Sequence, residues 1–167
     1  VTDCSTTATV VWTSTTTTQS VTKTGLTLSS GTTYYFHIRT TNGATTLSTV
    51  GNSDGIMVDT SAPTTPSVTD DGVYTTTAAQ LHATWSSTDA ESGITNNEYC
   101  INTNAATVTD CVSGAVTTWT STSTTQSVTK TGLTLSSGTT YYFHIQTTNG
   151  ATTLTTVGNS DGITVDN

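Results

Sequence analysis

Cysteines are the residues of this chain whose spacing most constrains their chemistry, and they stand at Cys4, Cys100 and Cys111. Cys100 lies at the end of a predicted strand, and Cys111 follows a loop of Asn, Ala and Thr residues. Two segments joined in this way come close enough to bond, so we predict a Cys100–Cys111 disulfide. Such a bond would stabilise the fold by about 3 kcal/mol and would indicate an oxidising compartment. The alternative is a pair of free thiols.

The three histidines, His37, His82 and His144, lack the spacing of a metal site or of a hydrolase motif. Each lies in a predicted strand, and we expect each to lie on the surface. Ser and Thr are abundant, so a serine close to a histidine has no catalytic meaning without a buried Asp that orients the histidine. We therefore expect no catalytic residues and no enzymatic activity.

Four aspartates lie along the middle of the chain: Asp54, Asp59, Asp70 and Asp71. Calcium is a hard cation that binds carboxylate and carbonyl oxygens, so these residues form a candidate calcium site between two repeats. The alternative is turn formation, because Asp-Gly and Asp-Asp-Gly are common turn sequences. No other cofactor is expected.

Aromatic side chains form a candidate binding surface. Trp12 and Trp119 lie in Thr-rich segments, and Tyr35 and Tyr142 are predicted to point outward from a strand. Together they could form a strip on which sugar rings stack. The alternative is that they cover the sheet or pack against a neighbouring copy.

The composition favours strands and excludes several partners. Of the 167 residues, 50 are Thr, 8% are charged, and the net charge is −8. Thr is β-branched and fits a pleated sheet. So few cations argue against nucleic acid and anionic membranes as partners, and no apolar run approaches the ~18 residues of a transmembrane helix. The Thr runs at 15–18 and 121–125 are candidate sites for O-linked glycans; alternatively, they supply strand propensity and solubility.

The chain contains an internal repeat. Residues 1–59 align without a gap to residues 108–166, with 49 identities in 59 positions. The repeat is therefore about 107 residues long, which is the size of a small domain. Residues 60–167 form one complete unit, and residues 1–59 form the C-terminal part of another. We interpret the chain as part of a tandem array.

Alternating apolar residues predict the strands of the complete unit. About seven short strands separated by turn sequences indicate an all-β sandwich. The residues predicted to face its core are Leu81, Ala83, Trp85, Tyr99, Ile101, Tyr141, Phe143 and Ile145.

Trp85, followed by Leu135-Ser-Ser-Gly-Thr-Thr-Tyr141, resembles the core tryptophan and the tyrosine corner of fibronectin type III domains. This resemblance implies tandem Ig-like/fibronectin type III-like sandwiches, in which the hydroxyls of Tyr141 and Tyr34 bond to nearby backbone. The Asp-x-x-Ser-Gly-Ile sequence at 89–94 is similar to that of bacterial or archaeal surface arrays. In the family's strand order, residues 1–59 supply strands C′, E, F and G.

Such a partial unit lacks strands A, B and C, and it would expose apolar surface and open strand edges. The same chain or a neighbouring copy could complete it, and the sequence leaves both alternatives open. The leading function is a structural segment of an extracellular or cell-surface array, such as a stalk, fibre or filament, with an adhesive role. Its partners would be other copies of the repeat, in a homopolymer or a long tandem array. The alternatives are a carbohydrate- or protein-binding module and a spacer of a large secreted enzyme.

Overall fold

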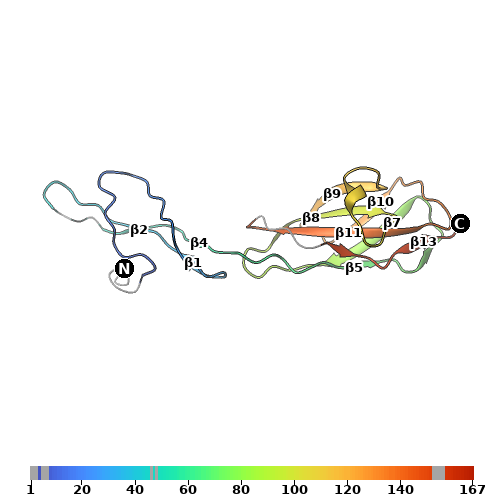
Figure 1. The fold of residues 1–167 in the computed structure, drawn as a ribbon, viewed down its shortest axis with the longest axis horizontal. Coiled ribbons are helices and arrows are strands. Elements are labelled where there is room, and N and C mark those ends of the chain that lie inside the picture. The colour runs from blue at the N-terminus through green and yellow to red at the C-terminus, as the bar shows by residue number, and fades with distance from the viewer. Residues whose placement is uncertain (1–3, 5–7, 46, 48, 152–156) are drawn as a thin grey trace. The chain divides into compact units, whose positions relative to one another are not determined.

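The computed structural model describes residues 4, 8–45, 47, 49–151 and 157–167 (Figure 1). Its contacts divide the chain into a first unit, Val1–Asp59, and a second unit, Thr60–Asn167. No helix among these residues is long and apolar enough to span a membrane.

The second unit is a β-sandwich, which confirms the predicted all-β fold. One sheet has the order β10-β7-β5, and the other has the order β6-β13-β11-β8-β9, with β12 also paired to β11. All of these pairs are antiparallel except β13–β6. The strands are β5 (Ser67–Asp70), β6 (Tyr74–Thr75), β7 (Gln80–Ser86), β8 (Ile94–Asn102), β9 (Thr117–Ser123), β10 (Ser127–Thr131), β11 (Thr140–Asn149), β12 (Gly158–Asn159) and β13 (Ile163–Val165).

This arrangement is the one expected of an Ig-like or fibronectin type III-like sandwich. Strands β5, β7 and β10 take the places of A, B and E, and β9, β8, β11 and β13 take those of C′, C, F and G. A three-residue 3₁₀ helix, η2 (Thr109–Cys111), lies between β8 and β9. Both sheets of the family's fold are therefore present in the second unit.

The core lies between the two sheets and follows the period-two pattern of the strands. In β7 the buried positions alternate with more exposed ones, which places Leu81, Ala83 and Trp85 on the inner face. Facing and neighbouring strands contribute the rest of the cluster: Tyr99, Ile101, Leu135, Tyr141, Phe143, Ile145, Ile163 and Val165. The Trp85 Nε1 donates a hydrogen bond to the buried Asn97 Oδ1 at 3.1 Å, so the polar edge of the indole also has a partner.

The described residues of the first unit form four two-residue strands: β1 (Thr33–Tyr34), β2 (His37–Ile38), β3 (Gly51–Asn52) and β4 (Ile56–Met57). β1 pairs with β4, and β2 pairs with β3. The same registers occur in the second unit, where β11 pairs with β13 and β12. The F–G hairpin of the repeat therefore forms in both units.

Strands C′ and E, which the sequence predicts in residues 1–59, are not formed there, and this is a correction. Residues 10–16 and 20–24 correspond to β9 and β10, yet the structure shows no strand at either segment. In the second unit β9 pairs with β8, and β10 pairs with β7. Both partners lie in residues 60–107, for which the first unit has no counterpart in this chain. A strand without its partner has nowhere to place its backbone hydrogen bonds.

Candidate functional site

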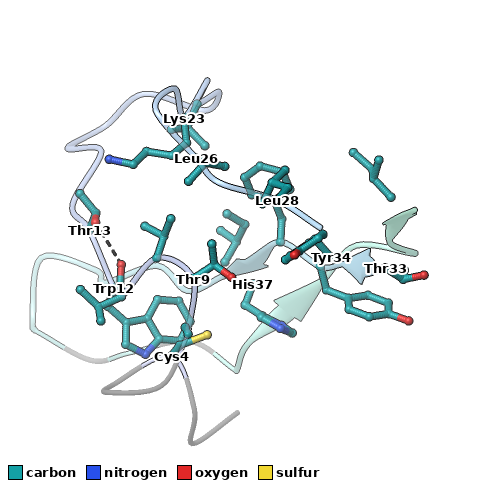
Figure 2. A pocket seen from close by; sticks show the side chains of 18 of the residues that line it. Cys4, Thr9, Trp12, Thr13, Lys23, Leu26, Leu28, Thr33, Tyr34 and His37 are labelled. Carbon is teal, nitrogen blue, oxygen red and sulfur yellow. Dashed lines mark hydrogen bonds between the residues drawn. The ribbon is translucent and has the colours of Figure 1, made fainter. Parts of the chain in front are cut away.

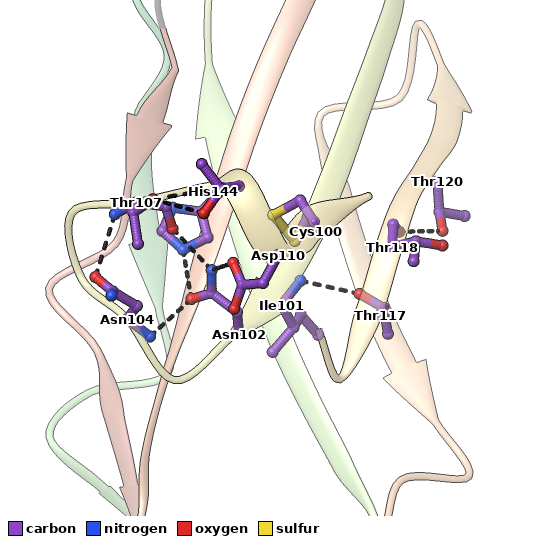
Figure 3. The surroundings of a disulfide bond; sticks show 12 residues. Cys100, Ile101, Asn102, Asn104, Thr107, Asp110, Thr117, Thr118, Thr120 and His144 are labelled. Atoms are coloured by element: carbon purple, nitrogen blue, oxygen red, sulfur yellow. Dashed lines mark hydrogen bonds between the residues drawn. A yellow bond between two sulfur atoms is a disulfide. The ribbon is translucent and has the colours of Figure 1, made fainter. Parts of the chain in front are cut away.

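The disulfide predicted from the cysteine spacing is confirmed. Cys100 and Cys111 are bonded, with their Cα atoms 5.7 Å apart, and both residues are fully buried. Cys100 lies on β8, and Cys111 ends η2, so the bond fastens the loop between them to the outer face of the sheet (Figure 3). This loop therefore covers a part of the sheet that would otherwise face solvent.

His144 lies beneath this loop and is fully buried, so the expectation of a surface histidine was wrong. Its Nδ1 is 2.7 Å from Asn159 Oδ1, and its Nε2 is 2.7 Å from Asn102 Oδ1. The Asn102 Nδ2 donates to Thr107 O at 2.9 Å and to Asp110 Oδ1 at 2.7 Å (Figure 3). Because both of those partners are acceptors, the Asn102 carbonyl must face His144, and His144 Nε2 donates to it.

The hydrogen-bond network of His144, Asn102 and Asn159 holds the loop between the two cysteines in place, which is a structural role. Every member contacts a partner within the fold, and His144 is the direct cross-strand neighbour of Cys100. The other histidine of the second unit, His82, is partly exposed, and its Nδ1 is 2.7 Å from Asp71 Oδ1. Buried polar groups are stable only when they are paired. The hydrogen bonds of Asn102, His144 and Asn159 link the loop to strands β8, β11 and β12.

The aspartates of the candidate calcium site are divided between the two units. Asp70 is buried, and its two carboxylate oxygens accept hydrogen bonds from the backbone N–H groups of Gly72 and Gly162, both at 3.2 Å. Asp71 pairs with His82. In the first unit Asp54 is exposed and Asp59 is partly buried. Turn formation accounts for Asp70, and the calcium site remains a prediction.

A fifth aspartate, which sequence reasoning did not single out as a ligand, closes the turn after β7. Asp89 Oδ1 accepts from the backbone of Ser92 at 2.8 Å and of Gly93 at 3.0 Å, and its Oδ2 accepts from Asn149 Nδ2 at 3.1 Å. The hydrogen bond from Asn149 is the largest of the causes that lower the pKa of Asp89 below 3.8. The charged form of Asp89 is therefore built into this turn.

Two tyrosines of the candidate sugar-binding strip cover glycines. The ring of Tyr142 lies so close to Gly162 that a Cβ atom on this glycine would overlap it, and Tyr35 is similarly close to Gly55. Both glycines have positive φ angles, 96° and 98°, which residues other than glycine adopt only at an energetic cost. The tyrosines thus fill the space beside glycines that immediately precede the neighbouring strands, β13 and β4.

The tryptophans of the same strip are partly buried. In the first unit the Arg39 guanidinium lies 4.2 Å from the centre of the Trp12 ring, which is a cation–π contact. Trp119 is on β9 of the second unit. Each unit holds one tryptophan and one tyrosine of the candidate strip, and sugar binding remains a prediction.

Tyrosine corners form in both units. The Tyr141 hydroxyl accepts a hydrogen bond from Ser136 N at 2.9 Å, and the Tyr34 hydroxyl accepts one from Ser29 N at 3.0 Å. The corner brings the turn before strand F against that strand. The first unit therefore has the local structure of the repeat although its sheet partners are absent.

An apolar groove is the most distinctive surface of the first unit. The groove has a volume of about 420 Å³, and Cys4 lies at its border (Figure 2). We call its apolar wall the open face, made of Val21, Leu28, Phe36, Ile38, Ile56 and Val58. The exposed fractions of Phe36, Ile38 and Ile56 are 45%, 52% and 62%, whereas their counterparts in the second unit are 0–2% exposed. Side chains of the core type are therefore uncovered on this face.

Comparison with known proteins adds little to this description. No protein-family model matches the chain, and no curated protein sequence matches it. Among solved structures, the crystal structure of domains A168-A170 from titin is similar, with a TM-score of 0.47 and 18% identity. The match covers 71% of this chain and 37% of the titin chain. The fold assignment rests on the strand order and the tyrosine corners described above.

Proposed function

We propose that this chain is a structural, non-enzymatic segment of an extracellular tandem array, such as a stalk, surface fibre or filament, which presents adhesive surfaces. The array consists of repeats of about 107 residues, as the 49 identities in 59 aligned positions indicate. The Asp-x-x-Ser-Gly-Ile sequence at 89–94 favours a bacterial or archaeal surface array. Other copies of the repeat are its partners, and O-linked glycans on the Thr runs are its expected modification.

The positions at which the chain enters and leaves the second unit carry this proposal. The Asn149 Nδ2 at one end of β11 donates to Ser61 O, close to the start of the unit. At the other end, Ser137, three residues before β11, bonds to Asn167. The ten residues of β11 span about 30 Å, so the chain enters and leaves at opposite ends of the sandwich (Figure 1). Repeats with this geometry lengthen an array, because each adds about one strand length.

Other features support a location outside the cell. The buried disulfide is of the kind that persists in oxidising compartments. The low charge and the high Thr content suit an exposed β-protein that carries glycans. The Tyr–Gly pairs account for two of the aromatic residues of the alternative carbohydrate-binding module, so the array is the favoured function.

Immuno-electron microscopy of intact cells that produce the natural protein tests the proposal. Antibodies raised against residues 60–167 should label fibres or a layer outside the cell envelope. Label confined to the cell interior would overturn the proposal. Preimmune serum, and antibodies absorbed with the purified chain, provide the controls.

A further inference from the structure

The open face of the first unit already has the form of one half of a sandwich. Phe36 N donates to Ser53 Oγ and Ser53 N donates to Phe36 O, both at 2.9 Å. The same reciprocal pair joins Phe143 to Ser160 in the second unit, at 3.1 and 2.9 Å. Together with the shared strand registers, these bonds show that the F–G hairpin needs no partner to take its final form.

In the second unit this face is covered by residues 60–107, which we call the first-half segment. Its strands β7 and β8 supply Leu81, Trp85, Tyr99 and Ile101 to the core cluster. The first unit has kept the apolar side chains that these residues pack against. The groove therefore matches a segment that has the size and the alternating apolar side chains of the first-half segment.

Two glycines of the first unit keep space for that segment. A Cβ on Gly158 would overlap the backbone carbonyl of Pro66, and a Cβ on Gly150 would lie 2.9 Å from Ser92 O. Their counterparts are Gly51, where the nearest atom is Ile38 O at 3.8 Å, and Gly43, which has nothing within 4 Å. At Gly158 and Gly150 the close approach is made by the first-half segment. Gly51 and Gly43 leave room for the same approaches.

Charge and sulfur chemistry match the same partner. Gln146 donates to Glu98 Oε2 of the first-half segment at 2.8 Å, and the first unit has Arg39 at this position. An arginine forms a stronger, charge-assisted bond to such a glutamate. Cys4, the counterpart of Cys111, is buried and not bonded to another cysteine. Its natural partner is therefore a cysteine at the position of Cys100.

We propose that the open face of the first unit is a docking site for one additional first-half segment of the repeat, and that docking joins Cys4 to that segment's counterpart of Cys100. This inference rests on the proposed repeat array.

The covalent step needs a small-molecule disulfide such as oxidised glutathione. The Cys4 thiolate attacks it, which forms a mixed disulfide and releases one glutathione. The thiolate of the docked segment then attacks the Cys4 sulfur, and the second glutathione leaves. Two thiols are oxidised and one glutathione disulfide is reduced to two glutathiones, so electrons and protons balance.

The test mixes the 167-residue chain with a separate peptide of residues 60–107 in a glutathione redox buffer. Peptide mapping by mass spectrometry should find a Cys4–Cys100 cross-link, and hydrogen exchange should show new protection of backbone amides in 10–16 and 20–24. A Cys100→Ala peptide should give the same protection without the cross-link. A peptide with Trp85→Asp and Ile101→Asp should give neither.

The Gly51→Ala chain is the sharpest variant. Its new Cβ meets only ordinary contacts in the free unit but would overlap the Pro66 carbonyl of a docked segment, so the binding should weaken about tenfold or more. Unchanged binding by this variant, a cross-link away from Cys4, or protection confined to residues 60–167 would overturn the proposal. So would dimerisation of the chain through the open face with no uptake of peptide.

A second experiment does not depend on the solubility of the free peptide. Residues 60–107 are joined genetically ahead of Val1, and unfolding is followed by calorimetry and by alkylation of Cys4. The fused chain should gain a second cooperative transition, and Cys4 should no longer be present as a free thiol after unfolding. A chain that shows neither change overturns the docking site. Fibres seen by microscopy would in that case still support the array, so the two proposals fail separately.

Discussion

Breaking the Cys100–Cys111 disulfide should destabilise the second unit strongly while leaving its strands in place. The bond closes a loop with a sequence separation of 11, which corresponds to about 3 kcal/mol of denatured-state entropy. With an unfolding entropy of about 2.1 cal/mol/K per residue, a unit of about 110 residues should lose roughly 13 °C in melting temperature. The Cys100→Ala/Cys111→Ala variant also loses the packing of two buried sulfur atoms, so its shift should be somewhat larger.

Differential scanning calorimetry of three proteins, each with and without a reductant, separates these effects. Wild-type chain with and without a reductant isolates the loop closure, because the sulfur atoms remain. The double alanine variant adds the packing loss, and it should not respond to the reductant. Cys4→Ala is the matched control, since Cys4 holds the same position in the first unit without a disulfide. A reductant shift below about 3 °C, or a Cys4→Ala variant whose second unit melts as low as that of the double alanine variant, would refute the reasoning.

Three further predictions concern the second unit. Gly158→Ala should lower its unfolding free energy by about 1–3 kcal/mol in urea titrations, because the new Cβ would overlap the Pro66 carbonyl, whereas Gly51→Ala should change it little. His144→Phe leaves buried amide groups unpaired, so it should cost about 1–3 kcal/mol and increase hydrogen exchange in residues 103–110. Asp89 contributes stability above pH 3.8 that is lost as the pH falls through its lower folded pKa. Acid titrations of Asp89→Asn should lack this loss, and an unchanged acid profile would contradict the assignment.

The strands and the inner core of the second unit were accessible from the sequence. Alternation placed Leu81, Ala83 and Trp85 on one face, and the structure buries all three. These features are local, since a half-buried strand must alternate every second residue whatever its partner is.

The burial of His144 could not be read from alternation. Period-two analysis assigns a residue to the outer face of a sheet, but it does not show that a loop covers this face. The available signal was the position of Asn102 and Asp110, which flank the two cysteines. A disulfide between those cysteines brings both polar groups toward the strand that carries His144.

The repeat provides its own demonstration of why strand prediction from sequence fails. The five residues Ser20–Thr24 and Ser127–Thr131 have the same sequence, Ser-Val-Thr-Lys-Thr. They form β10 in the second unit, where β7 lies beside them, and no strand in the first. Identical local propensity thus gives two outcomes, because the hydrogen-bond partner decides between them.

The same comparison explains why the first unit still holds an ordered hairpin. Strands F and G find each other within residues 1–59, so their pairing survives the absence of the first-half segment. Strands C′ and E depend on that segment and are absent from the described residues of the first unit. The boundary between formed and unformed strands therefore follows the pairing partners. Docking of such a segment should convert residues 10–16 and 20–24 into strands, because only then do their backbone groups acquire partners.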